Sequence, residues 1–472
     1  MELMPYQVEG VEWLKTKHTA ILGDDPGLGK TAQAIRACWA IGPWDIDSVL
    51  IVCPASLRLN WMLEWHKWSL GPGMPEPTIV SYNEATTNKA IYKKKWTVLI
   101  YDEAHYLKSK GNRPKKKKGV KVKYKNPHRA VRLLGTTTVR EEEVTRRGGI
   151  SADYRWFLTG SPITTGPADF YNLLHFCAPT VFFSRSAYEM EFCDGKYGDF
   201  GWEAKGATNI GRLKKRILDA GILLRRLKKN VLSQLPPKMR QVVEVPRASI
   251  DKDGKQALKG EEAALRELLG TGFEGELQTA TDEELYEAVM NKRYQKFEAI
   301  DKVKIEQGAS NAHEFRLLLA PAKVAAFLAY AKDEIKPRAG EKVIVWAYYH
   351  ETIAALKAGL DDLKIKSVVF DGTTSDKNRH AAVQSFQNDP ETQVFVGSSA
   401  AYEGLTLTAS NRSIVVEGSF IPGKNTQLED RIHRIGQEKP VLIQYLAVEG
   451  SYDLRILRVV VERMSVIKKL LG

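Results

Sequence analysis

The distribution of apolar residues predicts two groups of buried strands. Short runs of β-branched and other apolar residues recur within the first 160 residues and again after residue 340. Near-continuous apolar runs of this length are typical of strands that are buried on both faces. The predicted strands are residues 19–22, 49–52, 78–80, 97–100 and 156–158 in the first group and 343–346, 367–370, 394–396, 414–416 and 442–445 in the second.

Helical periodicity alternates with these apolar runs, for example over residues 31–40 and 56–68. A regular alternation of strand and helix indicates a parallel sheet with helices between its strands. We therefore predict an α/β protein that consists of two parallel-sheet lobes.

The pattern becomes mainly helical between the two groups of strands, over about residues 169–235 and 249–335. The sequence Leu235-Pro236-Pro237-Lys238 interrupts it, because proline cannot continue a helix. The predicted boundaries are residues 1–235 for the first lobe, 236–248 for a linker and 249–472 for the second lobe, with a terminal helix at 452–471.

The composition is typical of a soluble globular protein: of the 472 residues, 43% are hydrophobic and 27% are charged. No apolar stretch approaches bilayer length, and no signal segment opens the chain. Four cysteines without CxxC spacing argue against a structural zinc site and for a reducing compartment. We expect a cytoplasmic or nucleoid-associated protein from a bacterium or virus, without appended reader domains, and a nuclear one if the source is eukaryotic.

Positive charge is abundant and unevenly placed. The net charge of +13 and the pI of about 9.3 fit a polyanionic partner. Ten Lys and Arg residues and no acidic residue lie between Lys108 and Lys125, in a basic insertion at 108–125. Three interpretations stay open: a solvated disordered loop, a targeting signal, and a segment that follows DNA phosphates. In the third case the candidate DNA contacts are Lys115, Lys116, Lys117 and Lys118.

A phosphate-binding loop is predicted directly after the first strand, in Asp24-Asp25-Pro26-Gly27-Leu28-Gly29-Lys30-Thr31. Glycines let the backbone approach phosphates closely, and the N–H groups that open the next helix point at them. A lysine adds positive charge on the outer phosphates, and the hydroxyl after it can hold Mg²⁺. The strict pattern has glycine where this chain has Asp24, and a tight strand–helix turn is the alternative. The candidate ATP ligands here are Asp25, Gly27, Gly29, Lys30 and Thr31.

An acid pair follows the fourth predicted strand, in Asp102-Glu103-Ala104-His105. The carboxyl ends of parallel strands are where open α/β sheets bind ligands. We predict that Asp102 holds Mg²⁺ and that Glu103 orients and deprotonates the attacking water. The alternative is an ordinary acid pair at a helix N-terminus.

An arginine pair in the second lobe completes the predicted catalytic set. Arg431 and Arg434 are spaced i, i+3, and Gln427 lies four residues before Arg431. On a helix all three would share one face. Closure of the lobes would bring the guanidinium groups to the γ-phosphate, where such a group is worth about 10³–10⁵ in rate. The alternative is an ordinary surface helix.

Two further positions carry weaker signals. Gln7, ahead of the phosphate loop, has the amide donor and acceptor needed to read an adenine edge. Thr159 and Ser161 follow the strand at 156–158, and their hydroxyls would couple the water-activating site to the other lobe or contact a nucleic-acid strand. A plain turn is the alternative for this second position.

Together these motifs resemble the superfamily 2 ATPases and, within them, the Swi/Snf-type DNA translocases. The resemblance runs from Leu3 to about Leu457. Its markers are Tyr6-Gln7 with Gly10, residues 24–31 and 102–105, Leu158-Thr159-Gly160-Ser161-Pro162, Arg225-Arg226-Leu227-Lys228, Leu235-Pro236-Pro237-Lys238, Gly404-Leu405-Thr406-Leu407 and His433-Arg434-Ile435-Gly436-Gln437.

The resemblance implies two RecA-like lobes with helical protrusions and a terminal brace helix. It also implies ATP and Mg²⁺ as cofactors, with Gly404 and Gln427 among the nucleotide-binding residues, and double-stranded DNA as the activating partner. Cys193-Asp194-Gly195-Lys196 with Gly201-Trp202 resembles the annealing-helicase branch, which acts on branched or fork DNA. The chain begins at the adenine motif, so we expect no accessory substrate-recognition domain. Residues 136–149 and the basic insertion resemble additions to the family pattern.

We therefore predict an ATP-dependent translocase that tracks along double-stranded DNA, with reannealing of branched DNA as a narrower version. Such a motor holds phosphates, because phosphate contacts carry no sequence information. The alternatives are a strand-separating helicase and an ATP-binding DNA scaffold without turnover. No membrane partner is expected.

Overall fold

The structure is a computed structural model. The residues that it describes are 2–69, 71, 73–108, 129–141, 143–163, 166–198, 201–204, 206–232, 235–246, 258, 315–338, 340–401, 405–451, 454–461 and 464. Three predicted features fall outside these ranges in whole or in large part. They are the basic insertion with Lys115 to Lys118, the helical stretch at 249–335 up to residue 314, and the end of the terminal helix.

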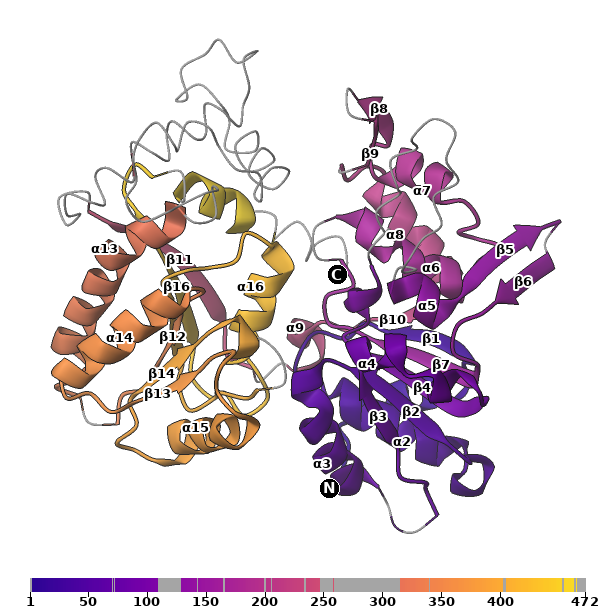
Figure 1. The fold of residues 1–472 in the computed structure, drawn as a ribbon, viewed down its shortest axis with the longest axis horizontal. Coiled ribbons are helices and arrows are strands. Elements are labelled where there is room, and N and C mark those ends of the chain that lie inside the picture. Colours follow the sequence, from indigo (N-terminus) through magenta and orange to yellow (C-terminus); the bar gives the residue numbers. More distant parts are fainter. Residues whose placement is uncertain are drawn as a thin grey trace. The chain divides into compact units, whose positions relative to one another are not determined.

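The chain forms two compact units, which are described one at a time below. The first comprises Met1–Ser233 and the second Gln234–Val466 (Figure 1).

The first unit is built on a six-stranded parallel sheet in the order β10-β1-β7-β4-β2-β3. All five predicted strands of the first group are present. The sixth, β10, is a two-residue edge strand that the sequence did not reveal because so short a run carries no periodicity. The strands are β1 (Thr19–Leu22), β2 (Val49–Cys53), β3 (Thr78–Ser81), β4 (Trp96–Asp102), β7 (Ala152–Leu158) and β10 (Leu223–Leu224).

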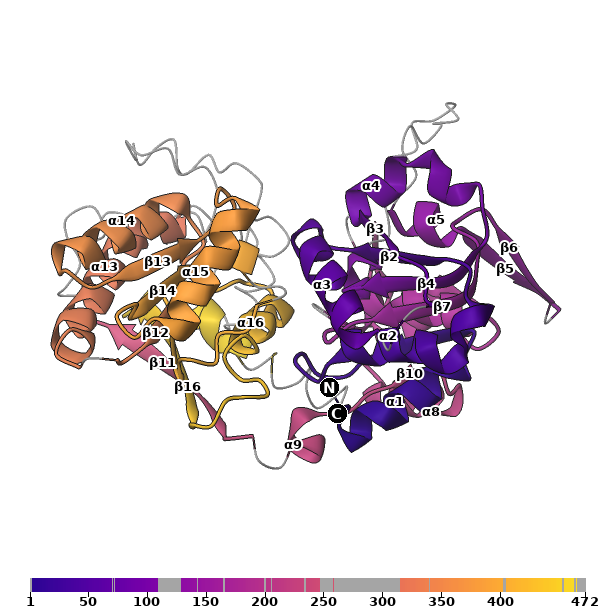
Figure 2. The same cartoon turned by 90° about the horizontal axis from the view of Figure 1, so that it is seen from below.

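Helices pack on both faces of this sheet (Figure 2). On one face, α1, α2 and α3 bury their apolar sides against Ala20, Ile51 and Ile100. On the other face, α4 to α8 pack against Leu50 and against other strand residues whose side chains point to that face. The helices of the unit are α1 (Pro5–Lys15), α2 (Lys30–Ile41), α3 (Arg58–Trp68), α4 (Tyr82–Thr87), α5 (Arg129–Leu134), α6 (Tyr171–Cys177), α7 (Arg185–Phe192), α8 (Ile210–Asp219) and α9 (Lys228–Val231).

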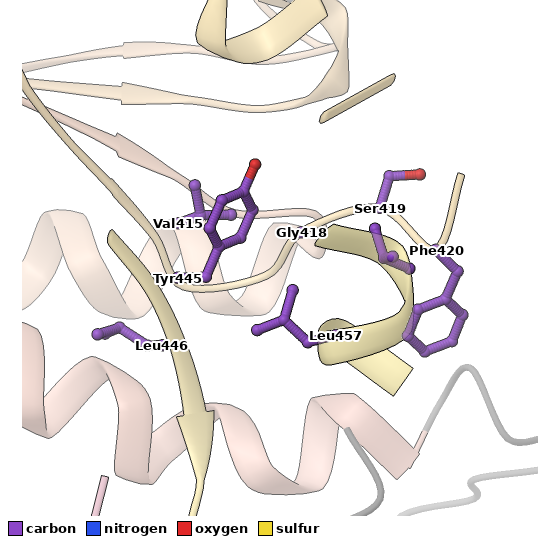
Figure 3. A pocket seen from close by; sticks show the side chains of 8 residues that line it. Val415, Gly418, Ser419, Phe420, Tyr445, Leu446 and Leu457 are labelled. Atoms are coloured by element: carbon purple, nitrogen blue, oxygen red, sulfur yellow. The ribbon is translucent and has the colours of Figure 1, made fainter. Parts of the chain in front are cut away.

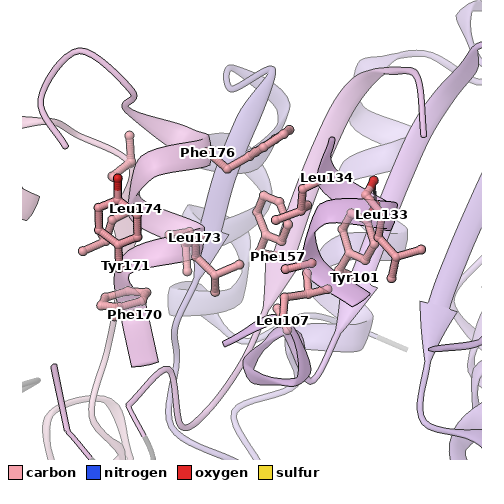
Figure 4. Close-up of a cluster of buried hydrophobic side chains, with 14 of the residues drawn as sticks. Tyr101, Leu107, Leu133, Leu134, Phe157, Phe170, Tyr171, Leu173, Leu174 and Phe176 are labelled. Carbon is pink, nitrogen blue, oxygen red and sulfur yellow. Dashed lines mark hydrogen bonds between the residues drawn. The ribbon is translucent and has the colours of Figure 1, made fainter. Parts of the chain in front are cut away.

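Aromatic residues fill the second of these layers, as Figure 4 shows. Tyr101 of β4 and Phe157 of β7 stack with ring centroids 5.2 Å apart, and Phe176 of α6 meets Phe157 edge-on at 5.6 Å. Such pairs add to the hydrophobic gain from burial. This packing fixes the ends of β4 and β7, which carry two of the predicted site motifs.

Two antiparallel hairpins decorate the first unit. The predicted addition at 136–149 is one of them, formed by β5 (Thr136–Arg140) and β6 (Glu143–Arg147). Its base requires glycine at Gly135, where φ is +79° and a Cβ would lie 2.5 Å from a carbonyl oxygen. The second hairpin comprises β8 (Lys196–Gly198) and β9 (Gly201–Glu203), within a stretch that we predicted to be mainly helical.

The second unit also contains a six-stranded parallel sheet, in the order β11-β16-β15-β12-β14-β13. The five predicted strands of the second group are present. The two sheets confirm the predicted α/β fold with two parallel-sheet lobes. The strands are β11 (Lys238–Val245), β12 (Val343–Trp346), β13 (Ser367–Phe370), β14 (Val394–Gly397), β15 (Arg412–Val415) and β16 (Val441–Val448).

Strand β11 occupies residues that we predicted to be linker, at 236–248. All eight of its residues pair with β16. It is an edge strand whose residues are largely half-buried or exposed, so it lacks the continuous apolar run of the interior strands. Met239 and Gln241, for example, are exposed.

Helices cover both faces of the second sheet as well. One layer contains α13 and α14, and the other contains α15 and α16 with the helical residues 454–461. These last residues form the described part of the predicted terminal helix. The other helices are α13 (Phe315–Tyr330), which continues as a π-helical turn at Ala331–Ile335, α14 (His350–Asp362), α15 (Asp376–Asn388) and α16 (Pro422–Glu429).

Short 3₁₀ turns complete the secondary structure, at Pro43–Asp45, Ala55–Leu57, Lys89–Tyr92, Ala104–Leu107, Pro167–Phe170 and Ser399–Ala401. Within the described ranges, no helix is both long and apolar enough to cross a bilayer.

Candidate functional site

The predicted phosphate loop joins β1 to α2. Gly27 and Gly29 have φ angles of +88° and +74°, in the region that favours glycine. A Cβ at Gly29 would lie 2.3 Å from Gln7 Nε2. The loop therefore requires glycine at both positions because of its backbone conformation. Helix α2 begins at Lys30, which directs the N-terminal N–H groups of the helix toward the loop.

Lys30 lies against the loop that it is predicted to serve. Its Nζ donates to the carbonyl oxygens of Asp24, at 2.8 Å, and Asp25, at 3.4 Å. Burial lowers the pKa of Lys30 below its ordinary value, while the carboxylates of Glu103 and Asp24 oppose that shift. The structure thus brings Lys30 and the acid pair together, and Thr31 follows as the second residue of α2.

The carboxylates of Asp24 and Asp25 are held by two arginines that lie some 200 residues further along the chain. Arg226 donates to fully buried Asp24 through its backbone N–H, at 2.9 Å, and through Nη2, at 2.5 Å. Arg225 Nη2 lies 2.9 Å from Asp25, whose other oxygen accepts the Lys228 N–H at 3.1 Å. Asp24 therefore replaces the usual glycine with a charge that the fold neutralises. Asp25, a predicted nucleotide ligand, is directed at Arg225.

These arginines also reach the motifs beside the loop. Arg226 Nη2 donates to Gln33 Oε1 at 2.6 Å, and Arg226 Nη1 contacts the Tyr6 carbonyl. Arg225 Nη1 contacts the carbonyls of Gly23 and, at 3.3 Å, Gly160. In the sequence, Arg225 and Arg226 are family markers without an assigned role, because contacts between residues about 200 positions apart cannot be read from sequence.

Gln7 is tied to the phosphate loop. Its Nε2 donates to the Leu28 carbonyl at 3.2 Å, and its Oε1 accepts the Met4 N–H at 2.9 Å. Tyr6 OH reaches the same Leu28 oxygen at 3.3 Å. Contact between Gln7 and adenine stays a prediction, and the structure adds a second role in supporting the loop.

The acid pair lies at the carboxyl end of β4, as predicted. Asp102 Oδ2 accepts the indole N–H of fully buried Trp61 at 2.8 Å, and its backbone carbonyl accepts the Tyr82 hydroxyl at 2.9 Å. Burial, together with the neighbouring Glu103, raises the pKa of Asp102 to about 7. Glu103 has a φ of +50°, and its Oε2 lies 3.2 Å from His105 Nδ1.

Thr159 and Ser161 are buried beside the acid pair. Thr159 Oγ1 lies 3.5 Å from His105 Nδ1 and accepts the Ser161 N–H at 3.2 Å. This geometry links the two hydroxyls to the acid-pair motif, and their coupling to the other lobe or to a nucleic-acid strand stays a prediction.

The arginine pair lies beyond α16, and the predicted single helix face is wrong. Helix α16 ends at Glu429, so Gln427 is helical whereas Arg431 and Arg434 occupy the turns that follow. Beyond Glu429 the backbone bonds become irregular: the Arg431 N–H donates to the Leu428 carbonyl at 3.1 Å, and the Arg431 carbonyl accepts the Leu407 N–H at 2.9 Å.

The two arginines nevertheless converge. Arg431 Nη1 and Arg434 Nη1 both donate to the Leu405 carbonyl, at 3.2 and 2.5 Å, and Arg434 also reaches Thr406 Oγ1 at 3.0 Å. Arg431 Nε donates to the Gln427 carbonyl at 3.0 Å. Gly404, the predicted nucleotide ligand next to Leu405, lies outside the described residues.

A buried carboxylate anchors this arginine turn. Fully buried Glu429 accepts from Lys238 Nζ at 2.7 Å, from Arg240 Nε and Nη2 at 2.6 Å each, and from the Tyr445 hydroxyl at 2.9 Å. Burial alone would raise the pKa of Glu429, but the two cations outweigh it and lower the pKa. Sequence reasoning missed this cluster, because Arg240 and Glu429 are almost 190 residues apart.

The predicted magnesium ligands suit the ion chemically. Thr31 and Asp102 supply a hydroxyl and a carboxylate, and Mg²⁺ prefers oxygen ligands, commonly one or two carboxylates together with substrate phosphates. Across the described ranges, no group of three or more His, Cys, Asp or Glu residues is placed to hold a metal ion. The oxygen set fits Mg²⁺ bound together with a nucleotide.

A small cavity lies in the second unit, lined by residues of β15, β16 and the helix at 454–461 (Figure 3). Its volume is about 10 Å³, room for one water molecule at most. Val415, Tyr445 and Leu457 make it largely apolar. It is a packing defect beneath that helix and too small to hold a nucleotide.

Comparison with protein families identifies two matching models. Residues 6–254 match the SNF2-related domain, and residues 326–436 match the helicase conserved C-terminal domain. The first match covers every site residue described above in the first unit, and the second includes the arginine pair.

Curated relatives align along nearly all of this chain. The SWI/SNF-related matrix-associated actin-dependent regulator of chromatin subfamily A-like protein 1 of Xenopus laevis is 29% identical, over 98% of this chain and 44% of its own length. The DNA annealing helicase and endonuclease ZRANB3 of Homo sapiens is 28% identical, over 96% of this chain and 39% of its own length. The chain thus spans less than half the length of these two relatives.

Solved structures also match this chain. The Sulfolobus solfataricus SWI2/SNF2 ATPase core in complex with dsDNA aligns over all of this chain and 93% of its own, with 20% identity and a TM-score of 0.40. Because the SNF2-related domain alone matches more than half of the sequence, this chain belongs to the SNF2-related family.

Proposed function

We propose that this chain is a DNA-stimulated ATPase that moves along double-stranded DNA. The observation that carries the proposal is the set of residues gathered at one edge of the first sheet. There a glycine-dependent phosphate loop, Lys30 and the acid pair Asp102-Glu103 lie close enough for their charges to shift one another's pKa values. A half-buried lysine beside two carboxylates at the carboxyl edge of a parallel sheet suits phosphoryl transfer from a nucleotide.

Each residue has a distinct task in this proposal. Lys30 and the N–H groups that open α2 bind the phosphates, and Thr31 and Asp102 hold Mg²⁺, which supplies charge stabilisation at the phosphates when bound. Glu103 orients the attacking water and takes its proton. Arg431 and Arg434 stabilise the negative charge that spreads over the γ-phosphate oxygens in the transition state.

Duplex DNA is the proposed partner because of the net charge of +13 and the family membership of the chain. Relatives named as regulators of chromatin and as a DNA annealing helicase support the same partner. Reannealing of branched DNA is the narrower version of this proposal, supported by the second of those names. The chromosomal DNA of its source, in nucleoid or nucleus, would then be its place of action.

Displacement of a third strand from a DNA triplex tests movement directly. We expect ATP-dependent displacement by the parent protein and none by Lys30→Ala, which removes the charge that binds the phosphates. A forked duplex with one fluorescent strand separates the main alternative, because a strand-separating helicase would release that strand. ATP binding without hydrolysis on every DNA tried would instead favour a scaffold.

The basic insertion has its own test. Replacing Lys115, Lys116, Lys117 and Lys118 with Gln should weaken duplex binding and flatten its salt dependence, by up to about 0.9 in the log–log slope for each lost phosphate contact. Fluorescence anisotropy between 50 and 200 mM salt measures that slope, a range over which phosphate contacts have a large effect. An unchanged slope would show that these lysines do not contact DNA.

A further inference from the structure

The segment that leaves the first unit is attached to the back of the phosphate loop. Arg225 and Arg226 follow edge strand β10 and hold Asp25 and Asp24, the first acidic residues of the loop. Backbone pairing reinforces these ion pairs, since Asp25 N–H donates to the Arg226 carbonyl at 3.0 Å. Loop and segment are therefore joined by both side chains and backbone.

The same segment is attached to the back of the arginine turn where it enters the second unit. Lys238 and Arg240, both in β11, hold Glu429, the last residue of α16. His433 adds a third contact, because its Nε2 lies 2.8 Å from the Pro236 carbonyl oxygen, to which the ring N–H donates. His433 lies between Arg431 and Arg434 in sequence, so this contact also holds the turn.

The two attachments share a construction. In each attachment, a buried carboxylate of a catalytic element pairs with an arginine of the connecting segment. Both partners are largely shielded from water. Such pairs are stiff, because moving one partner away leaves an uncompensated buried charge. Only nine residues, 229–237, separate Lys228 from Lys238, and the first three of them belong to α9.

We infer that the two attached stretches of the connecting segment, residues 225–228 and 238–240, act together as a coupling strap, which transmits a change at the phosphate loop to the turn that carries Arg431 and Arg434. Arg226 and Arg240 are its positioning residues, because they act through Asp24 and Glu429. The inference rests on the proposed function, and it adds the route by which nucleotide bound at the loop controls the position of the arginine pair. A longer connection should uncouple the phosphate loop from the arginine turn and leave each of them intact.

An insertion tests this inference without disturbing either attachment. Gly-Ser-Gly-Ser between Ser233 and Gln234 lengthens the strap, and the same insertion between Gly340 and Glu341, in an exposed turn of the second unit, is the matched control. We expect the strap insertion to leave the Kd of a fluorescent ATP analogue within about twofold of the parent. We also expect it to lower duplex-stimulated kcat by about tenfold or more, since misplacing a catalytic group by 1 Å can cost ~10²-fold. A kcat no lower than that of the control insertion would overturn the strap.

Removal of the second attachment gives an independent test. Arg240→Gln combined with Glu429→Gln removes both charges and leaves neither one buried alone. We expect a lower kcat with little change in the KM for ATP. The control is Glu244→Gln, which removes an exposed ion pair of β11 with Arg458. A double variant with the kcat of this control would show that the pair only stabilises the fold.

Amide exchange separates failure of the strap from failure of the proposed function, because it needs neither DNA nor turnover. In the parent, a Mg²⁺-bound ATP analogue should slow exchange in β11, and the strap insertion should abolish that slowing while analogue binding persists. Equal slowing in both proteins would refute the strap and leave the ATPase proposal standing. A parent that hydrolyses ATP at one rate with and without duplex would refute the proposed function alone.

Discussion

Two acid pairs of the first unit show how similar sequences acquire different roles. Asp24-Asp25 and Asp102-Glu103 both follow a strand of the same parallel sheet and both lie beside Lys30. The first pair is neutralised by Arg226 and Arg225, whereas Asp102 receives its hydrogen bonds from the neutral indole of Trp61 and from the backbone. The first pair therefore holds the loop in shape, whereas no arginine of the described ranges holds the Asp102 carboxylate, which suits it to a bound cation.

The largest expected effect comes from the second pair. Glu103→Gln should lower kcat by about 10²–10⁴-fold, because an amide cannot accept the proton of the attacking water. ATP binding should persist, which analogue titration would show beside steady-state turnover. Glu12→Gln, in an exposed pair with Lys15, is the control. Turnover of Glu103→Gln at the parent rate would remove the distinction between the two acid pairs.

Loss of the first pair should affect stability instead. Asp24→Asn leaves Arg226 buried without its counter-charge, which should lower the free energy of unfolding by about 3–5 kcal/mol. Chemical denaturation measures this loss. Asp219→Asn, which removes an exposed pair with Lys215, should cost only about 0.3–0.5 kcal/mol. Equal losses from the two substitutions would show that the Arg226 attachment is not a structural anchor.

The pH dependence of the metal-free protein provides a third contrast. The pKa of Asp102 is raised to about 7 in the folded protein, above its ordinary value of 3.8, so the folded state binds a proton more tightly than the unfolded state. Stability should therefore fall as pH rises from about 4 to about 7, as linkage requires. Denaturation in EDTA at several pH values, with Asp102→Asn beside the parent, measures this contribution. A variant with the full pH dependence of the parent would contradict it.

The smallest expected effect comes from removing the indole N–H of Trp61, which donates to Asp102. Trp61→Phe keeps most of the buried volume but removes a hydrogen bond to a carboxylate, worth about 1.5–3 kcal/mol. The Mg²⁺ concentration that gives half-maximal turnover should rise, with little change in analogue affinity. Trp65→Phe, in the same helix and also buried, is the control. Equal Mg²⁺ dependence in the two variants would show that Trp61 only fills space.

Prediction from sequence succeeded where the signal was local. Interior strands such as Val49–Cys53 are continuous apolar runs, and the order of strand, loop and helix indicated the phosphate loop and the acid pair. Edge strand β11 was assigned to linker because Pro236 and Pro237 interrupt the pattern just before it and its own residues form no continuous apolar run. The single helix face predicted for Gln427, Arg431 and Arg434 is wrong because α16 ends at Glu429, and residue spacing alone does not show where a helix ends.

Contacts between residues far apart in the sequence account for the other features that could not be predicted. Nothing near Asp24 in sequence indicates that Arg226 neutralises it, and Lys238-Met239-Arg240 gave no sign that Glu429 lies beneath it. Gly404, Lys115 to Lys118, most of residues 249–335 and the end of the terminal helix lie outside the described residues. They remain predictions.

ATP turnover with and without linear duplex DNA tests the central claim most directly, with Lys30→Ala as the inactive reference. The account predicts that saturating duplex raises the turnover of the parent severalfold or more, and that Lys30→Ala stays at background in both conditions. Turnover by the parent that is low and equal with and without duplex would contradict it.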